Sequence, residues 1–385
     1  MFITGEVQAQ TAESEYDGYG YNNYDDNNNY NSAEYYPSSY ESYDDYMQKD
    51  LLADIIVPID FPTIQSAIDA ADEGDVIKVL SGTYTEQITI SKSLTIIGST
   101  AKSTIIEAPT EGLGANLIGR PYIIDINNEA EVTLKGFTIA NPASVSCGEI
   151  IAISVLDGGS INLKSAAFRG CTSDTIYIGQ ASNGRGGPQV GHATITDTYI
   201  TDYLYRGVHA LGSGSTLIMS YNDIIGSELN IDWAGGGIFL RNGAQGTITH
   251  NIVAGNICNN PVCGPKLIGQ NQDGGIAIIS ADEGSVISNN YLSNNDWGIG
   301  VIGGSECCIL DHNKLTDNRF LGVGIQDSEH TVSNTKIFGG NVGVAAIATN
   351  ANTTATLDHV KIVNADISVQ ALSSSGFTAA VNVIS

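Results

Sequence analysis

The chain has few positive charges and no long hydrophobic run, and both absences limit its partners. Only 16 of its 385 residues are Lys or Arg, against 42 Asp or Glu, so the formal net charge is −26. A surface this acidic repels nucleic acid, anionic lipid and polyuronates unless a local basic patch or bound cations reverse the field. No run of about 18 apolar residues occurs. We therefore expect neither a nucleic-acid partner nor a membrane-spanning helix.

The first 50 residues lack the aliphatic side chains that could form a core. Residues 11–50 consist almost entirely of Tyr, Asn, Asp, Ser and Glu. Such a segment cannot offset the entropy of ordering, so residues 1–50 are predicted to be a disordered acidic tail or a cell-surface linker. Val7-Gln8-Ala9 resembles a signal-peptide cleavage site, without the usual basic and apolar regions before it. Residues 1–9 are therefore either a signal-peptide remnant or an ordinary N-terminus.

From residue 51 onward the sequence repeats, which predicts a single domain over residues 51–385. Short β-rich runs recur at steps of about 21 to 38 residues, mostly about 21 to 25. Coils of this length without intervening helices form a solenoid of parallel sheets, in which each strand pairs with its counterpart one coil along. The aligned runs begin at Ile150, Thr175, Gly207, Gly237, Gly275, Gly298, Gly322 and Gly343.

Asn residues repeat in a second register, which we interpret as structural ladders. Asn tolerates the left-handed bend of a turn and can bond to the equivalent Asn one coil away. The pairs are Asn251 and Asn256, Asn290 and Asn295, and Asn313 and Asn318, with His359 and Asn364 as a further repeat. A stacked column of His250, His312 and His359 is a second interpretation. No His/Cys cluster has zinc-site spacing, so no metal site is predicted, and Ca²⁺ is the one cofactor left open.

The segment 61–86 resembles the opening of pectinesterases. Its first part, Phe61-Pro62-Thr63-Ile64-Gln65-Ser66-Ala67-Ile68, matches the capping helix of that family, and Gly82-Thr83-Tyr84-Thr85-Glu86 matches the early Gly-x-Tyr-x-Glu pattern. With the repeats, residues 55–385 resemble the pectin-lyase-like right-handed parallel β-helix superfamily. The resemblance implies an all-β, right-handed parallel β-helix with an N-terminal capping helix near Thr63 to Ala71. That superfamily holds enzymes of several classes and proteins without known chemistry.

The catalytic motifs of these enzymes are not found in the sequence. The pectinesterase segments Gln-Asp-Thr and Asp-Phe-Ile-Phe-Gly have no counterpart, nor do the paired Asp of polygalacturonases or the Asp-Pro-His of alginate epimerases. Ile118-Gly119-Arg120-Pro121-Tyr122 resembles the late Leu-Gly-Arg-Pro-Trp of pectinesterases, but it precedes most of the coils. We interpret Arg120 as a coincidence and expect no pectinesterase activity.

Alternation of side chains along the aligned runs predicts one outward column with a bulky centre. The column reads Ala152, Tyr177, His209, Phe239, Ala277, Gly300, Gly324 and Ala345. The next outward position adds Arg241, and the turns before the strands add Asp174, Arg206, Asp232 and Trp233. Two long inserts flank the same coils and carry Arg185, Lys266 and Asp273.

Aromatic rings beside charged groups are typical of a sugar site. The predicted substrate-binding residues are Tyr177, Asp174, Arg206, Trp233 and Phe239, and the predicted catalytic residues are Asp232, His209, Arg241 and Asp273. A carboxylate pair, Asp202 or Asp232 with Asp273, suits glycoside hydrolysis. His209 or Tyr177 as base, with Arg206 or Arg241 neutralising a uronate carboxylate, suits β-elimination. Stacked rings and a surface ion pair without any ligand are the alternative.

The six Cys residues favour an oxidising, extracellular setting over reduced thiols in a core. Cys147 and Cys171 are one coil apart, within reach of a disulfide. Cys258 and Cys263 would close a step within the second insert, and Cys307-Cys308 is a vicinal pair.

Three functions are consistent with these patterns. The first is a secreted or cell-surface protein that binds polysaccharide or cell-surface glycan in a groove on the central coils; if it is an enzyme, it is a polysaccharide lyase or a glycoside hydrolase. The second is a non-catalytic structural surface protein or assembly subunit. The third is a metal-related periplasmic accessory protein.

Overall fold

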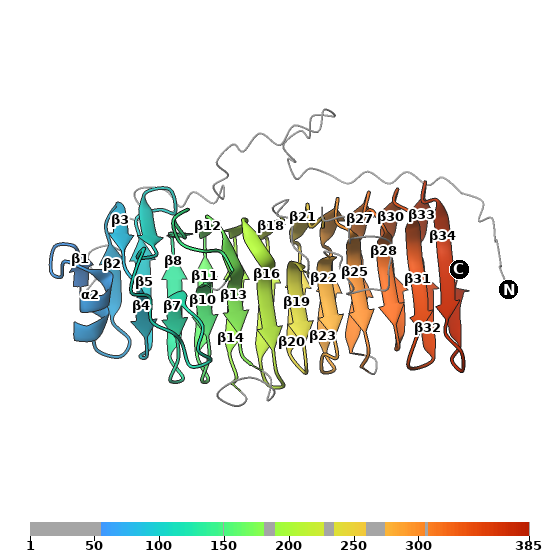
Figure 1. Ribbon diagram of the computed structural model, residues 1–385, viewed down its shortest axis with the longest axis horizontal. Helices are drawn as coiled ribbons and strands as arrows, with labels where there is room; N and C mark the ends of the chain where they lie inside the picture. The colour runs from blue at the N-terminus through green and yellow to red at the C-terminus, as the bar shows by residue number, and fades with distance from the viewer. Residues whose placement is uncertain are drawn as a thin grey trace. The chain divides into compact units, whose positions relative to one another are not determined.

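The chain forms a solenoid of three parallel sheets (Figure 1). The computed structural model describes residues 55–384 except residues 149, 181–188, 227–234, 259–273 and 305–306. In chain order, successive strands belong to sheet A, sheet B and sheet C, and each pairs in parallel with its counterpart one coil along. The predicted all-β parallel solenoid is confirmed.

Within the described residues the sheets hold 13, 11 and 11 strands. Sheet A comprises β1 (Ile55–Val57), β2 (Val76–Val79), β5 (Leu94–Gly98), β8 (Glu131–Lys135), β11 (Ser160–Lys164), β14 (His192–Thr196), β17 (Thr216–Ser220), β20 (Gln245–Thr249), β23 (Ser285–Ser288), β26 (Cys308–Asp311), β29 (Glu329–Ser333), β32 (Thr353–Asp358) and β35 (Ala379–Ile384). Sheet B comprises β3 (Gly82–Thr85), β6 (Thr104–Glu107), β9 (Thr138–Ala140), β12 (Ala167–Arg169), β15 (Tyr199–Ile200), β18 (Asp223–Ile225), β21 (Ile252–Ala254), β24 (Tyr291–Ser293), β27 (Lys314–Thr316), β30 (Lys336–Phe338) and β33 (Lys361–Val363). Sheet C comprises β4 (Ile88–Ile90), β7 (Tyr122–Ile126), β10 (Ile151–Val155), β13 (Thr172–Ile178), β16 (Tyr203–Leu211), β19 (Gly236–Arg241), β22 (Gly274–Ile279), β25 (Trp297–Ile302), β28 (Leu321–Gln326), β31 (Val342–Ala348) and β34 (Ile367–Ser373).

Sheets A and C differ in how their outer faces are covered. In sheet A the burial alternates, as in β8, where Val132 and Leu134 face the core and their neighbours face solvent. In sheet C the strands β10, β13 and β31 are buried at every residue. A parallel strand that is covered on both faces reads as a nearly continuous apolar run. The outer face of sheet C is therefore where side chains cluster outside the core.

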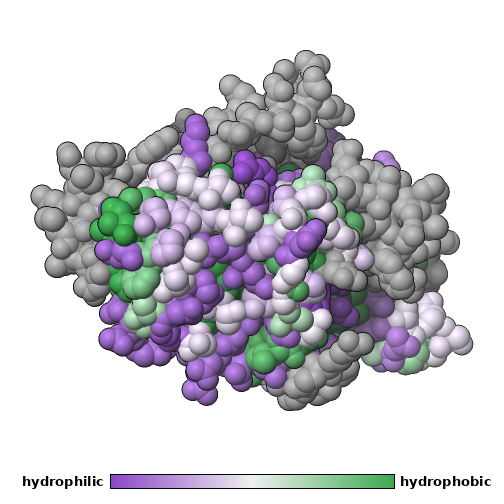
Figure 2. Space-filling model, turned by 60° about the vertical axis from the view of Figure 1, so that its left-hand side comes forward, coloured by the Kyte–Doolittle hydropathy of each residue, from purple (hydrophilic) through white to green (hydrophobic). Residues whose placement is uncertain are grey.

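The first coil is closed by the helix α2 (Ile64–Ala70), which confirms the predicted capping helix. Thr63 is the N-cap and forms a capping box with Ser66, and the apolar face of the helix is buried. The carboxylate of Glu86 accepts hydrogen bonds from the backbone N–H groups of Ile64 and Gln65, each at 2.9 Å. Glu86 of the Gly-x-Tyr-x-Glu pattern thus anchors the helix. At this end of the solenoid, hydrophilic residues separate small hydrophobic patches (Figure 2).

The predicted Asn ladders are present. Asn251 Nδ2 donates to Asn290 Oδ1 at 3.1 Å, and Asn290 Nδ2 donates to Asn313 Oδ1 at 3.2 Å. A second, parallel ladder runs through Asn256, Asn295 and Asn318. Stacked amides of this kind satisfy buried polar groups at the same corner of successive coils.

The left-handed backbone lies one residue before each laddered Asn. His250, Asn289 and His312 have positive φ values, and the laddered residues that follow them do not. His359 and Asn364 also have left-handed backbone conformations, with φ values of 53° and 58°. They therefore occupy the preceding position, and the prediction that they continue the ladder is wrong by one residue. The His column is also interrupted, because Asn289 lies between His250 and His312.

The structure contains the disulfide Cys147–Cys171, with the Cα atoms 5.0 Å apart, and the vicinal disulfide Cys307–Cys308. Cys258 is also disulfide-bonded, and its predicted partner, Cys263, lies outside the described residues. Among the described helices, none has the length and apolar character needed to cross a membrane.

Candidate functional site

The strand register of sheet C confirms most of the predicted outward column. Tyr177 pairs with His209, and His209 pairs with Phe239. The column then continues through Ala277, Gly300, Gly324 and Ala345. The prediction is wrong at the first member of the column, Ala152. The residue that pairs with Tyr177 is Ser154.

Strand β10 departs from strict alternation, which explains that error. Ala152 and Ile153 both belong to the interior core, whereas Ile151 belongs to an outer cluster with Tyr177. The next strand carries a register irregularity between Thr172 and Asp174. Because the alternation breaks at this level of the coils, Asp174 and Tyr177 both lie on the outer side of sheet C.

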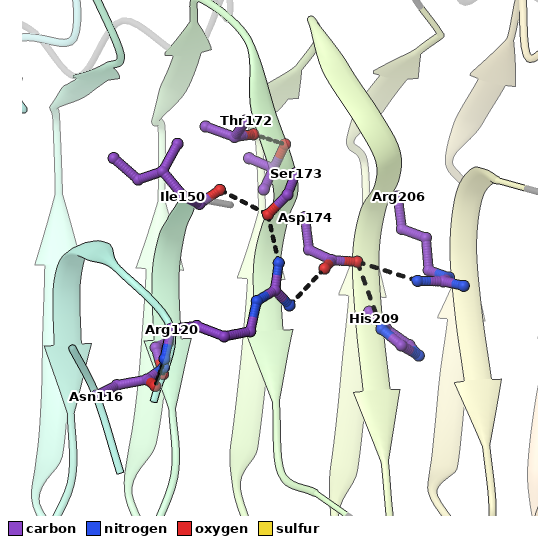
Figure 3. Close-up of polar contacts among 10 residues, drawn as sticks. Asn116, Arg120, Ile150, Thr172, Ser173, Asp174, Arg206 and His209 are labelled. Carbon is purple, nitrogen blue, oxygen red and sulfur yellow. Dashed lines mark hydrogen bonds and ion pairs between the residues drawn. The ribbon is translucent and has the colours of Figure 1, made fainter. Parts of the chain in front are cut away.

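Asp174 is the centre of a charged cluster on this outer face (Figure 3). Arg120 Nη1 donates to Asp174 Oδ2 at 2.8 Å, and Arg206 Nη1 donates to Asp174 Oδ1 at 3.4 Å. Nδ1 of His209 also lies 3.4 Å from Asp174 Oδ1. Asp174 is 2% exposed, so its charge is compensated by these groups rather than by solvent.

Arg120 reaches the cluster from the segment between β6 and β7. The side-chain Oδ1 of Asn116 accepts hydrogen bonds from the backbone N–H groups of Ile118 and Arg120, at 3.2 and 3.0 Å, which holds the turn. The second guanidinium nitrogen, Nη2, contacts the hydroxyl of Ser173, which donates to the carbonyl of Ile150 at 2.7 Å. Figure 3 shows this chain of contacts.

Sequence reasoning left Arg120 and Ser173 out of the site. In the sequence, Arg120 belongs to a segment that resembles a pectinesterase motif and precedes most of the coils. That resemblance does not indicate that Arg120 lies beside the central coils. A usable signal was the long segment between Glu107 and Tyr122, because a segment without strands must lie on an outer face of the solenoid. Its single Arg was a candidate for that face.

Three rings stack along the outward column beneath the Arg side chains. The ring centroids of Tyr177 and His209 are 5.3 Å apart, and those of His209 and Phe239 are 6.2 Å apart, both edge to face. The guanidinium of Arg120 lies over Tyr177 and that of Arg206 lies over Phe239, at 5.4 and 5.0 Å from the centroids. The rings are buried, whereas the Arg120 and Arg206 side chains are 28% and 19% exposed. A ligand would therefore meet guanidinium groups first.

The cluster fixes the charge state of its members near neutral pH. Burial by itself would raise the pKa of the Asp174 carboxyl, but the contact with His209 and the charges of Arg206 and Arg120 hold that pKa well below its usual range. Burial, with the nearby charge of Arg206, lowers the pKa of His209 to about 3. Burial and the Asp174 charge raise the pKa of Tyr177 to about 12. Asp174 is thus ionised, and His209 and Tyr177 are neutral.

Arg241 completes the cluster from the end of β19, opposite Leu211. Burial and the charge of Arg206 lower its pKa, and Tyr177 and Asp174 act in the opposite direction. In the part of the chain that the structure describes, the Nε atoms of Arg206 and Arg241 and both ring nitrogens of His209 are buried without a hydrogen-bond partner. Buried polar atoms of this kind call for a ligand or water.

Most of the remaining predicted site residues lie outside the described part of the chain. Asp232, Trp233 and Asp273 lie outside the described residues, as do Arg185 and Lys266. Asp202, the alternative carboxylate, holds a left-handed turn position with φ of 60° just before β16.

A separate surface depression of about 560 Å³ lies at the turns between sheets C and A. It is lined by Gln245, Ser280, Ala281, Asp282, Glu283 and Gly304. Asp282 already accepts a hydrogen bond from Ser213 at 2.7 Å. Its acidic lining distinguishes it from the arginine cluster.

The comparison with protein families gives one match, to a right-handed β-helix region over residues 227–384. The parallel coils described above carry the same architecture through the rest of the described chain. The described part of the chain therefore folds as a right-handed parallel β-helix. No curated protein matches its sequence.

Several solved structures are similar to this β-helix in fold. A GH136 lacto-N-biosidase from Eubacterium ramulus is 10% identical with a TM-score of 0.52, over 83% of this chain and 64% of that one. The A-module of a mannuronan C-5 epimerase from Azotobacter vinelandii is 11% identical with a TM-score of 0.47, over 84% of this chain and 94% of that one. A surface adhesin of Streptococcus pneumoniae is 12% identical with a TM-score of 0.46, over 80% of this chain and 88% of that one. At these identities the likeness concerns the fold.

Proposed function

We propose that this β-helix binds a carboxylate-bearing polysaccharide at the arginine cluster, formed by Arg120, Arg206 and Arg241 around Asp174. The observation that carries the proposal is the local excess of positive charge. Three of the six Arg residues of the chain act on one buried carboxylate, in a protein of formal net charge −26. A polyanion is repelled by most of such a surface, so a local basic patch decides where it binds.

The type of cation favours a carboxylate as the recognised group. A guanidinium presents its N–H groups as a planar fork that matches the two oxygens of a carboxylate. Arg206 and Arg241 both retain an unpartnered Nε in the described structure. We propose a saccharide as the carrier because the rings of Tyr177 and Phe239 border the arginines, and because a lacto-N-biosidase shares the fold.

The charge states favour binding over cleavage. General acid–base catalysis needs groups whose pKa values lie near the operating pH. Asp174 has a pKa well below that range, His209 titrates at about 3 and Tyr177 at about 12. The described members of the cluster therefore hold a ligand more readily than they transfer its protons. The disulfide Cys147–Cys171 supports a location in an oxidising compartment, so we place the protein outside the cytosol.

A binding assay on paired polysaccharides tests the proposal. Polygalacturonate and alginate are compared with uncharged glucans by calorimetry, using the full chain. Arg241→Gln removes one positive charge from a residue that forms no ion pair with Asp174 in the described structure, and it should weaken uronate binding at least about tenfold. The matched control, Arg169→Gln, changes an exposed Arg at the end of β12 and should leave binding unchanged.

A second variant should strengthen uronate binding, in contrast to Arg241→Gln. Asp174→Asn removes the one negative charge of the cluster and should tighten uronate binding, while it lowers stability because Arg120 and Arg206 lose their partner. Equal binding of charged and uncharged glycans, or no difference between Arg241→Gln and Arg169→Gln, would refute the proposal. Analysis of the polysaccharide after incubation shows whether chains are cut.

A further inference from the structure

Three residues with metal-ligating side chains meet on the inner side of sheet A, several coils beyond the arginine cluster. Cys307 and Cys308 are joined as a disulfide between neighbours in sequence. Nε2 of His330 lies 4.0 Å from Sγ of Cys307. Among the residues that the structure describes, these three form one group in which the ligand atoms all lie within 4.8 Å of one another.

The strand register brings His330 onto the pair. Leu310 of β26 pairs with Val332 of β29, and both are buried in the core. Cys308 and His330 each lie two residues earlier on these strands, so they face the same side and stack on successive coils. Cys307 is 0% exposed and His330 is 6% exposed. The cluster therefore belongs to the interior of the solenoid.

Other coils fill this interior column with small or apolar side chains. Cys308 pairs with Ser285 one coil before, and His330 pairs with Ala355 one coil after. Ala355 pairs with Val381 in the next coil. The register thus places an imidazole beside two sulfur atoms in a column where the neighbouring coils carry Ser, Ala and Val.

We propose that Cys307, Cys308 and His330 bind one Cu⁺ ion inside the β-helix when the disulfide between the two Cys residues is reduced. Thiolate and imidazole are ligands that suit copper, and thiolates select the monovalent ion. Zn²⁺ holds thiolate sulfur at about 2.3 Å and imidazole nitrogen at about 2.0 Å, so two such donors on one ion of similar size are at most about 4.3 Å apart. The 4.0 Å between Cys307 Sγ and His330 Nε2 meets this bound. This site is independent of the proposed polysaccharide site.

The site can bind metal only after reduction, because the metal ligand is a thiolate and neither sulfur atom of a disulfide is a thiolate. A small thiol reductant that reaches the disulfide attacks Sγ of Cys308, the less buried of the two residues. The thiolate of Cys307 leaves, and a second reductant thiol then releases Cys308. Two reductant thiols become one disulfide and two protein thiols form. Binding of Cu⁺ releases both thiol protons. The metal site is therefore gated by the redox state of its surroundings.

The number of ligands favours Cu⁺ over Zn²⁺. Structural Zn²⁺ is almost always bound by four protein ligands. The column neighbours are Ser285, whose hydroxyl oxygen accepts from the backbone N–H of Gly246 at 3.1 Å, and Ala355, which has no ligand atom in its side chain. The described residues thus supply three ligand atoms in this cluster, namely two sulfur atoms and one nitrogen atom.

Competition with bicinchoninate for Cu⁺ tests the proposal on the full chain. The protein is reduced with a phosphine, desalted under anaerobic conditions and titrated with Cu⁺. The reduced wild type should bind one equivalent more than the Cys307→Ser/Cys308→Ser variant, and the oxidised wild type should lack that equivalent. His330→Asn should weaken binding about tenfold or more. X-ray absorption should show two sulfur and one nitrogen neighbours.

The controls separate this site from the other cysteines. The Cys147→Ser/Cys171→Ser variant should retain the extra equivalent. Circular dichroism verifies folding of every variant, and Cys308→Ala, which changes only the half-buried member, replaces the double Ser variant if that one does not fold. Equal Cu⁺ binding by the reduced wild type and the variants of Cys307 and Cys308 would overturn the proposal. Unchanged affinity in His330→Asn, or displacement of Cu⁺ by one equivalent of Zn²⁺, would also overturn it.

Discussion

At the scale of single residues, His209 links the charge of the cluster to its packing. It stacks between Tyr177 and Phe239 and lies against the carboxylate of Asp174, at 4% exposure. A neighbouring carboxylate ordinarily favours the protonated ring, but burial and Arg206 dominate here and the pKa falls to about 3. The folded protein therefore holds this imidazole neutral in conditions where the unfolded chain protonates it.

This difference predicts how stability depends on pH. The unfolded His titrates at about 6.5, so the stability due to neutral His209 is complete above that pH and is lost as the pH falls toward about 3. Between pH 7 and 4.5 the loss should be about 2 to 3 kcal/mol of unfolding free energy. Asp174, whose pKa is lowered, keeps its contribution in this interval. Urea unfolding of the wild type and of His209→Phe at both pH values measures this loss of unfolding free energy. An equal loss in the two proteins would show that His209 is not its cause.

At the scale of the strand, close backbone contact inside sheet C depends on Gly. In β25, a Cβ added at Gly298 would lie 2.5 Å from Leu315 Cδ2 and 2.6 Å from the carbonyl oxygen of Gly322. Gly275 and Gly322 meet the same kind of contact one coil away on either side. The runs that begin with Gly in the sequence therefore mark where the backbone of one coil approaches the next.

Gly298→Ala should destabilise the protein by about 1 to 3 kcal/mol, because the added methyl overpacks a site whose neighbour is backbone. Gly148→Ala is the matched control, since a Cβ there meets nothing within 4 Å. Chemical denaturation at neutral pH compares the two variants with the wild type. A Gly298→Ala protein as stable as Gly148→Ala would show that the strands can separate at no cost.

The sequence predicted these elements well, and the site less completely. The repeat of Gly-initiated runs placed Tyr177, His209 and Phe239 in one column, because parallel coils stack equivalent positions. The sequence did not identify Ser154 as the member of the outward column in β10, because side chains of β10 do not alternate strictly between the core and the outer face. The sequence predicted outward-facing rings beside charged groups, and the structure buries these rings beneath the guanidinium groups. No periodic pattern contains that information.

At the scale of the whole solenoid, the two ends of the described chain differ. The first coil packs against α2, whereas the last strands, β34 and β35, are mostly exposed along their length. Apolar side chains such as Ile367, Leu372 and Val383 are 40%, 43% and 65% exposed there. Strands that bury little apolar surface have low local stability. We therefore expect β34 and β35 to be locally less stable than β31 and β32, whose residues are buried fully or alternately.

Hydrogen exchange should report this gradient. Amides of β34 and β35 should exchange at least about tenfold faster than those of β31 and β32, although all four are hydrogen-bonded strands. Mass spectrometry of peptides from the exchanged chain measures the rates, and peptides covering β2 and β5 near the capping helix provide the comparison. Uniform protection from β31 to β35 would contradict the link between the exposure of these strands and their local stability.

Periodicity in the sequence determined the coils, the Asn ladders and the capping helix, because each depends on residues at fixed, local spacings. The tertiary structure alone decided which charges meet. Arg120 and Asp174 are 54 positions apart and come together only because an irregular segment folds over the outer face. His330 reaches Cys307 in the same way, through the register of two coils. Contacts of this kind are set by how the chain folds back on itself, which a local pattern does not encode.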